Sequence, residues 1–449
     1  MTTPIDVFES LRADFFRYYG TPYRLRYPHI ESERRELLDT EGSTWREPWI
    51  EPVVEYRLSG LGVDQALRDA GGDADLAEFV KCGLIGYPDI FRHQAASLAA
   101  VRTGKNVVVT AGTGSGKTES FLLPVVDALL MESRSWTGSS PAGERWWAIK
   151  DAQHQAQRAR EHGRLPGVRA LILYPMNALV EDQLVRLRRA LDSDAARQWL
   201  KTNRGGHRFY FGRYTGATPV SGRRVRSTKT TQLKRALVDA EERFDAWRHD
   251  EEKRYFLQSL DGAEMRCRWD MQAHAPDLLI TNYSMLNIML LRDIEHGMFE
   301  QTRRWLESDP NNVFHLVVDE LHMYRGTSGT EVAFLVRNLL NRLGLHPDSP
   351  QVRFIATSAS LGGDAAGRTY LTEFFGAAGS SFELLEGERV VPDDPPVSLE
   401  RFADIFTAWG VSDDAIDGGQ ALEVLAESRA KDAISAAAER SSDLAGQTV

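Results

Sequence analysis

One segment constrains the fold of this chain more than any other, a glycine-rich loop between an apolar run and a helical run. The apolar run is Asn106–Ala111, and the loop continues to Gly116-Lys117-Thr118. A helical pattern over Ser120–Met131 follows. Glycines let successive backbone N–H groups turn toward one anion, and the next helix directs its positive end at the same point. The order of strand, loop and helix predicts an α/β unit that holds a phosphate group.

Strand and helix patterns alternate through the middle of the chain. The apolar runs are continuous, which is typical of strands covered by helices on both faces. This alternation predicts an α/β fold, with a doubly wound, mostly parallel sheet. The expected strands are Asn106–Ala111, Arg169–Tyr174, Arg208–Phe211, Leu278–Thr281, Phe314–Asp319 and Arg353–Thr357, and the expected helices include Ser120–Met131, Ala178–Leu191, Ser284–Arg292 and Gly329–Leu343.

Interruptions of this rhythm suggest the domain organisation. We expect a helical accessory region at 1–86, a nucleotide-binding lobe at 87–380 and a linker with a helical tail at 381–449. Polar, helix-prone stretches at about 132–166 and 220–276 are expected to be insertions in the lobe.

Composition and apolar pattern exclude several classes of protein. Its 54 Lys and Arg against 64 Asp and Glu give a net charge of -10, which excludes a uniformly basic coat but leaves room for a local basic face. No apolar run approaches the roughly 20 residues that span a bilayer, and the first residues lack a secretory pattern. We therefore expect a cytoplasmic protein with no membrane partner.

The two cysteines exclude a disulfide framework or a four-cysteine metal site within this chain. Cys82 and Cys267 are expected to be small buried thiols in a reducing compartment. Neither has a partner at metal-ligand spacing, and His93 and His274 lie in no recognisable constellation.

The loop chemistry favours a nucleoside triphosphate. Lys117 offers a point charge to the β- and γ-phosphates, and the Thr118 hydroxyl is suited to Mg²⁺. The strict pattern G-x-x-x-x-G-K-S/T has glycine where this chain has Ala111. The alternative interpretation is a glycine-rich turn with a chance lysine.

A second apolar run, Phe314–Asp319, ends in a pair of acids. Asp319 and Glu320 are expected at the carboxyl edge of the sheet, where open α/β folds bind ligands. There Asp319 would hold Mg²⁺, Glu320 would deprotonate the attacking water, and His322 would sense the γ-phosphate. The alternative is an acidic helix N-cap.

These motifs resemble those of superfamily 2 helicases. Ala111–Thr118 looks like motif I, A-x-T-G-x-G-K-T, which accounts for the alanine, and Asp319–His322 resembles the DExH form of motif II. Thr357-Ser358-Ala359-Ser360 resembles motif III, with serine in place of the last threonine, which couples hydrolysis to movement. Gln94 lies where the family reads adenine. The resemblance implies a RecA-like lobe that uses ATP and Mg²⁺, bound by Gln94, Ala111, Gly112, Thr113, Gly114, Ser115, Gly116, Lys117 and Thr118.

The resemblance also implies contacts with a nucleic-acid strand. The segments similar to motifs Ia, Ib and Ic are Tyr174–Gln183, Tyr214–Pro219 and Thr281–Leu286. They contribute short hydroxyl and amide groups just past strands, which are suitable donors to phosphate oxygens. Capping of the following helices is the alternative. Tyr324-Arg325-Gly326 is most similar to the MrfA-like branch of bacterial DNA helicases, which implies DNA, with RNA still open, and a context of repair or anti-phage defence. The implied contact residues are Pro175, Asn177, Thr215, Gly216, Thr281 and Asn282.

Two features of the insertions have alternative roles. Arg223, Arg224 and Arg226 belong to a basic run that either follows phosphates or forms a solvated loop. The tryptophans at 136, 146 and 147 either stack on bases or, as we favour, anchor their insertion.

After motif III, Gly362–Val449 is too short for a second lobe and lacks the family's Q-x-x-G-R-x-G-R pattern. We therefore expect a second RecA-like lobe in a downstream or partner polypeptide, and slow or absent ATP hydrolysis by this chain alone. The alternatives to a helicase are a nucleotide-switched scaffold and a translocase that moves on duplex without separating strands.

Overall fold

The computed structural model describes residues 4–21, 25–40, 42–46, 55–112, 114–141, 143–224, 228–251 and 253–390. The chain divides into two compact units, of which the larger is Glu55–Arg389 and the smaller includes Met1–Val54. Each is considered by itself. The linker and tail predicted beyond residue 390 lie outside the described residues.

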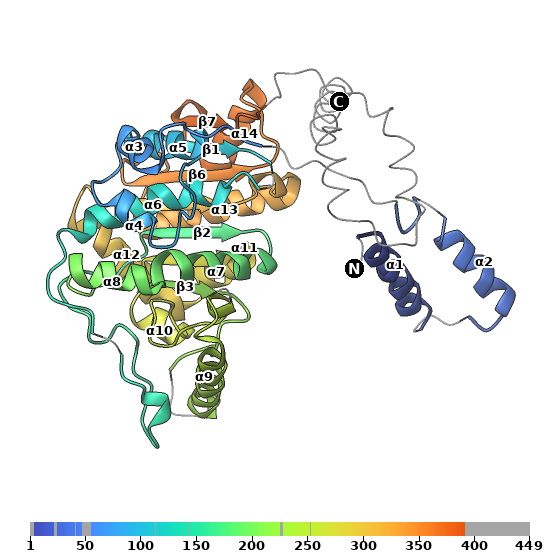
Figure 1. The fold of residues 1–449 in the computed structure, drawn as a ribbon, viewed down its shortest axis with the longest axis horizontal. Coiled ribbons are helices and arrows are strands. Elements are labelled where there is room, and N and C mark those ends of the chain that lie inside the picture. The colour runs from blue at the N-terminus through green and yellow to red at the C-terminus, as the bar shows by residue number, and fades with distance from the viewer. Residues whose placement is uncertain are drawn as a thin grey trace, which may run out of the picture. The chain divides into compact units, whose positions relative to one another are not determined.

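The larger unit is built on one sheet of seven strands, every neighbouring pair of which is parallel (Figure 1). Because all strands point the same way, the loops that leave their carboxyl ends meet at one edge. The predicted α/β, parallel fold is confirmed. The strands are β1 (Asn106–Thr110), β2 (Ala170–Tyr174), β3 (Phe211–Tyr214), β4 (Leu278–Asn282), β5 (Phe314–Val318), β6 (Val352–Ser358) and β7 (Phe382–Glu386), in the order β3-β4-β2-β5-β6-β1-β7.

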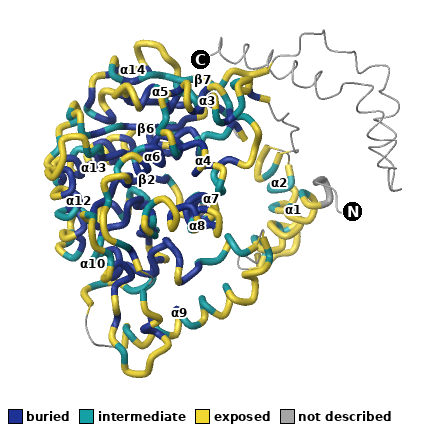
Figure 2. The backbone as a smooth tube through the Cα atoms, turned by 60° about the vertical axis from the view of Figure 1, so that its left-hand side comes forward, coloured by how far each residue is buried: buried dark blue, intermediate teal, exposed yellow. Residues whose placement is uncertain are grey.

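Helices cover both faces of this sheet, so successive strand residues enter different cores. Val107 and Val109 belong to one hydrophobic cluster and Val108 to the other. Figure 2 shows the resulting buried interior. Double burial explains why these strands are apolar throughout. The first cluster includes α3 (Val63–Asp69), α4 (Leu76–Val80), α5 (Arg92–Arg102), α6 (Lys117–Ser133), α7 (Asn177–Asp192) and α8 (Asp194–Asn203), and the second includes α10 (Arg268–Ala273), α11 (Tyr283–Leu291), α12 (His296–Ser308), α13 (Gly326–Leu343) and α14 (Ala365–Phe375).

Three details differ from the sequence prediction. β3 begins at Phe211, where the predicted strand ended, and continues through Gly212, which packs closely: a Cβ there would lie 2.5 Å from Met271 Sδ. β7 was not predicted, since this edge strand is only partly buried and carries two glutamates. The larger unit begins at Glu55, ahead of the predicted boundary at residue 87, and α3 and α4 share the first core with the sheet.

The two predicted insertions pack against each other through α9 (Thr228–Trp247). Trp146 and Trp147 are buried beside Leu233 and Leu237, and Trp136 packs against the first core. These burials favour anchoring of the insertion over stacking on bases. The short 3₁₀ helices of the larger unit are η1 (Trp146–Ala148), η2 (Lys253–Phe256), η3 (Asp293–Glu295), η4 (Leu321–Met323) and η5 (Gly379–Ser381).

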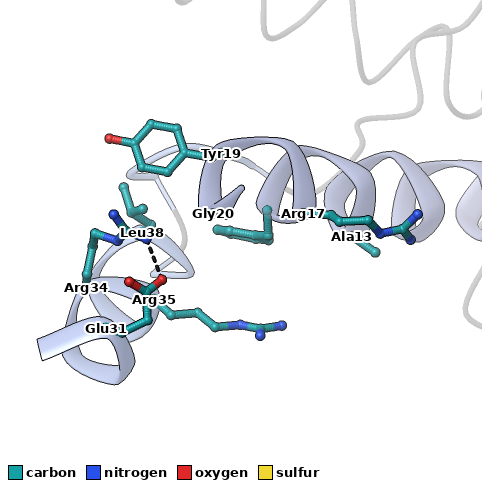
Figure 3. A pocket seen from close by; sticks show the side chains of 9 residues that line it. Ala13, Arg17, Tyr19, Gly20, Glu31, Arg34, Arg35 and Leu38 are labelled. Carbon is teal, nitrogen blue, oxygen red and sulfur yellow. Dashed lines mark hydrogen bonds and ion pairs between the residues drawn. The ribbon is translucent and has the colours of Figure 1, made fainter. Parts of the chain in front are cut away.

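The described part of the smaller unit consists of α1 (Pro4–Gly20) and α2 (Pro28–Leu38). They line a hollow of about 400 Å³ whose wall carries Arg17, Arg34, Arg35 and Glu31, with Arg34 paired to Glu31 (Figure 3). Across the described residues of both units, no helix has the length and apolar character needed to cross a membrane.

Candidate nucleotide and nucleic-acid site

The glycine-rich loop joins β1 to α6, as predicted, and two of its glycines are structurally required. Gly114 and Gly116 have φ angles of +77° and +70°, a region that disfavours other residues. A Cβ on Gly116 would also lie 2.2 Å from Gln94 Nε2. Ala111 is buried at the end of β1, and Thr113 lies outside the described residues.

Two side chains that the sequence did not suggest hold this loop. The Gly112 amide donates to the Tyr56 hydroxyl at 2.8 Å, and His93 Nε2 donates to the Ser115 carbonyl at 2.8 Å. Burial lowers the pKa of His93, so the neutral ring is favoured. The expectation that His93 has no constellation is therefore wrong. Its place beside Gln94, one residue from a predicted adenine contact, was the available signal.

The loop and the acid pair meet at one point. Lys117 Nζ donates to Glu320 Oε1 at 2.9 Å, although the two residues are 203 positions apart in sequence. Both side chains are mostly buried, with 14% and 24% exposed. Asp319 is also buried, and burial raises its pKa, with the neighbouring charge of Glu320 adding to that effect. The structure thus brings the predicted catalytic residues together.

Motif III contacts motif II through its first residue. Thr357 Oγ1 donates to Asp319 Oδ1 and accepts from the Glu320 amide at 3.1 Å. Glu320 has a φ of +51°, an uncommon conformation for a non-glycine residue that such bonds help to maintain. Thr357 and Ser358 are both fully buried.

A second link lies further along the two motifs. His322 Nδ1 is 3.3 Å from both the Ala359 amide and Glu320 Oε2, so one ring tautomer accepts from the amide and the other donates to the carboxylate. Arg325 donates to the Ser360 carbonyl at 3.2 Å. Thr357, Ala359 and Ser360 of the predicted coupling segment therefore contact the loop that follows β5, and Ser358 lies between them.

A cavity of about 510 Å³ adjoins the loop and includes Gln94, Lys117 and Glu320 in its lining. The Gln94 amide is braced by backbone: its Nε2 donates to the Gly116 carbonyl at 3.0 Å and its Oε1 accepts from the Phe91 amide at 2.9 Å. Thr118 Oγ1 accepts from Gln183 of α7 at 3.2 Å, which connects the loop to the helix after β2.

The residues predicted to contact a nucleic-acid strand divide into exposed and buried groups. Asn282 Nδ2 donates to Asn177 Oδ1 at 2.6 Å across the sheet edge, while Asn282 Oδ1 caps α11. Asn177 and Gly216 are exposed, and Pro175 is half-buried.

Thr215 and Thr281 are buried, so their side chains do not reach the surface as direct contact would require. Thr281 Oγ1 donates to the Tyr214 carbonyl at 2.7 Å, and the Thr215 amide donates to Thr218 Oγ1 at 3.0 Å. Thr281 lies in β4 and Thr215 in the bend that follows β3, where neighbouring chain segments need hydrogen-bond partners. Their hydroxyl-bearing segments brace the edge instead of facing a ligand.

The basic run shows a similar division. Arg223 and Arg224 are exposed, whereas Arg226 lies outside the described residues. Lys229 and Lys234 donate to the carbonyls of Ser221 and Ile149, each at 2.7 Å, which ties the run to its own insertions.

The expectation that neither cysteine has ligand-type partners is wrong for Cys267. His154, Cys267 and Asp270 come together: one ligand atom from each lies within 4.8 Å of the other two, and all three residues are buried. The spacing Cys267-x-x-Asp270 was the available signal, but His154 is far away in sequence. Cys82 is half-buried, not fully buried as expected.

Comparison with known proteins gives several similarities. The profile of the DEAD/DEAH box helicase family matches residues 91–209. The Druantia protein DruE of Escherichia coli is 32% identical over 94% of this chain and 24% of its own length. The ATP-dependent helicase HRQ1 of Saccharomyces cerevisiae is 22% identical over 61% of this chain and 16% of its own length. The chain thus spans about a quarter or less of these relatives.

Among solved structures, the DUF1998 helicase MrfA bound to DNA is 19% identical, with a TM-score of 0.42, and the match covers 84% of this chain and 38% of that one.

Proposed function

We propose that the chain belongs to the DEAD/DEAH box helicases of superfamily 2, and that its larger unit is the ATP-binding lobe of a DNA helicase or translocase. The observation that carries this proposal is the 2.9 Å contact between Lys117 and Glu320. It joins a phosphate-binding loop to an acid pair at the carboxyl edge of a parallel sheet, where α/β folds bind ligands.

The ion pair suggests how the triphosphate engages the site. Phosphate oxygens carry more negative charge than Glu320 and compete with it for Lys117. Once Lys117 turns to phosphate, the Glu320 carboxylate is released to accept a proton from the attacking water.

The groups beside this pair fit Mg²⁺. The ion prefers hard oxygen ligands, and the Thr118 hydroxyl and the buried Asp319 carboxylate provide them. Bound Mg²⁺ would neutralise charge on the β- and γ-phosphates. Thr357 keeps the Asp319 carboxylate oriented by donating to it.

Gln94 is suited to adenine. Its amide has two N–H hydrogens and two oxygen lone pairs, and the bonds to Gly116 and Phe91 use one of each. The remaining hydrogen and lone pair match the N7 acceptor and N6 donor of adenine. Because the same amide contacts Gly116, adenine binding would also fix the phosphate loop.

Motif III provides the coupling between nucleotide and strand. Thr357 contacts Asp319 and the Glu320 amide, and Ser360 contacts Arg325. A change in Glu320 on phosphate binding would therefore be felt along β6 and at the start of α13. His322 contributes by exchanging between the Glu320 carboxylate and the Ala359 amide.

For the strand, we propose that Asn177, Asn282 and the Gly216 backbone contact phosphates, with Pro175 beside them. Neutral donors of this kind hold a strand without reading its sequence. Thr215 and Thr281 act indirectly, through the buried bonds that shape the same edge.

The complete motor is proposed to need a second RecA-like lobe from outside these residues. Such a lobe supplies an arginine finger, which neutralises charge in the transition state and raises turnover by orders of magnitude. DNA repair or anti-phage defence is the proposed context. Within the described residues there is one RecA-like sheet.

The proposal is tested by DNA-stimulated ATPase activity, measured for the chain alone and together with the polypeptide that carries the second lobe. Lys117→Ala and Glu320→Gln should each abolish turnover, and Glu320→Gln should still bind ATP. Lys105→Ala and Glu383→Gln are matched controls, since Lys105 and Glu383 pair with each other at the amino end of β1 and β7. Full turnover by Lys117→Ala would overturn the proposal. Comparing strand separation with movement along duplex DNA would then distinguish a helicase from a translocase.

Strand contact has its own test. Asn177→Ala should weaken DNA binding about threefold to tenfold for any sequence, the value of one hydrogen bond to phosphate. Asn311→Ala, an exposed asparagine in the loop before β5 and hence at the opposite edge, should have no effect.

Replacing Arg223, Arg224 and Arg226 with alanine should flatten the salt dependence of binding. An unchanged slope would assign the basic run to a solvated loop.

A further inference from the structure

The two insertions meet at a buried cluster that the ATP site does not use. His154 comes from the first insertion, and Cys267 and Asp270 flank the start of α10 in the second. His154 Nε2 lies 2.9 Å from Asp270 Oδ1 and 3.8 Å from Cys267 Sγ. Trp146 and Trp269 pack edge-on against the imidazole, and its buried Nδ1 has no hydrogen-bond partner among the described residues, so the ring makes its polar contacts through Nε2.

These distances can be compared with those of a tetrahedral zinc site. Zn–N bonds of about 2.0 Å and Zn–S bonds of about 2.3 Å place the nitrogen and sulfur about 3.6 Å apart. The observed separation of 3.8 Å is within a few tenths of this value. The carboxylate oxygen would need to move by about 0.5 Å from its hydrogen bond to reach the corresponding nitrogen–oxygen spacing.

The residue types and their order also fit. A thiolate, an imidazole and a carboxylate suit Zn²⁺ better than Mg²⁺ or Ca²⁺, which prefer oxygen alone. Cys267-x-x-Asp270 repeats the two-residue gap common between zinc ligands, with the first ligand at the N-cap of a helix. The surrounding side chains of Trp146, Leu260 and Trp269 are buried and apolar, a setting that limits competition by water.

We propose that His154, Cys267 and Asp270 bind one Zn²⁺-class ion that joins the two insertions. Binding releases the Cys267 thiol proton to solvent and forms a sulfur–metal bond. The proton between His154 and Asp270 leaves Nε2 as the ring takes its Nδ1–H tautomer, so that Nε2 and the Asp270 carboxylate each bind the ion. A water molecule completes the four-coordinate set.

The ion would stabilise a region next to the proposed strand contacts. From α10, Arg268 donates to the Thr215 carbonyl at 2.6 Å, and its amide donates to the Pro219 carbonyl at 3.2 Å. Trp269 Nε1 donates to the Gly222 carbonyl at 3.0 Å, where the basic run begins. Fixing the start of α10 therefore fixes the chain from Thr215 to Gly222. This consequence rests on the proposed function, whereas the metal site does not.

The chain has only two cysteines, which makes a direct test possible without altering the cluster. The full 449-residue chain carrying Cys82→Ser is purified without chelator, and its zinc content is measured by mass spectrometry. It is then stripped and reconstituted with Co²⁺. We expect about one zinc per chain and a thiolate-to-cobalt charge-transfer band. Because Cys267 is the sole thiol in this variant, the band assigns the ligand.

Substitutions of the proposed ligands provide the complementary test. Cys267→Ser should lose both the zinc and the band, and Asp270→Asn, which keeps the side-chain shape, should weaken zinc binding at least tenfold, an effect of about 1.4 kcal/mol or more. Circular dichroism reports whether each variant folds. A folded Cys82→Ser chain with neither zinc nor the cobalt band would overturn the proposal, as would a folded Cys267→Ser chain that retains both. Since no nucleotide or DNA is added, failure of the motor proposal leaves these outcomes unchanged.

Discussion

Replacing Thr357 with valine tests the connection between motifs II and III. The hydroxyl of this fully buried residue donates to Asp319 Oδ1 and accepts from the Glu320 amide. Valine keeps nearly the same shape but makes neither bond. The carboxylate oxygen then lacks a donor, and the amide lacks an acceptor, at a site with little access to water.

The cost follows from these two losses. A hydrogen bond to a charged group contributes about 1.5–3 kcal/mol, and a buried amide left without a partner costs about 1–3 kcal/mol. We therefore expect Thr357→Val to lower the free energy of unfolding by about 3 kcal/mol. Because the Thr357 bond lowers the pKa of Asp319, its loss should also raise that already elevated pKa further and weaken Mg²⁺ binding as pH falls.

Urea unfolding monitored by tryptophan fluorescence measures the change. The matched control is Thr357→Ser, which keeps the hydroxyl and loses one methyl group, at a cost of about 1 kcal/mol. If valine costs no more than serine, the hydroxyl does not support the acid pair and the reasoning is refuted.

Three further predictions concern the same unit. Tyr56→Phe removes the acceptor of the Gly112 amide and should lower the free energy of unfolding by about 1 kcal/mol in urea, whereas no change would show that the contact is incidental. Burial lowers the pKa of His315 to about 4, below the unfolded value of about 6.5, so protons bind the unfolded chain preferentially and stability falls as pH drops from about 6.5 toward 4. His315→Leu should remove about 2 kcal/mol of the loss measured in urea between about pH 7.5 and pH 5, and an identical loss in both proteins would contradict this assignment. Gln94→Ala should weaken ATP binding about tenfold in calorimetry while GTP binding changes little, and an equal loss for both would instead assign Gln94 to bracing the loop at Gly116.

The sequence predicted those elements in which one pattern dominates. β1, β2, β4, β5 and β6 are continuous apolar runs, because each is covered on both faces, and their positions were predicted to within a residue or two. β3 was displaced, since the packing of Gly212 against Met271, which places this glycine inside the strand, leaves no pattern in the sequence. β7 was missed because an edge strand needs little apolar surface.

In the candidate site, too, the features that have a local sequence pattern were predicted. The loop and the acid pair are local patterns, and the parallel sheet necessarily brings their ends to one edge. Contacts between distant segments, such as Tyr56 with Gly112, leave no local pattern. Burial was equally hidden, since Thr215 and Thr281 look like surface donors until the chain folds around them.

The account's central claim is that one nucleotide lies between the loop and the acid pair. The most direct measurement is an experimental structure of the chain with Mg²⁺ and a non-hydrolysable ATP analogue. We predict that Lys117 Nζ leaves Glu320 for the β- and γ-phosphates, with Mg²⁺ between Thr118 and Asp319. An analogue bound elsewhere, or one that leaves the Lys117–Glu320 pair intact, would contradict the claim.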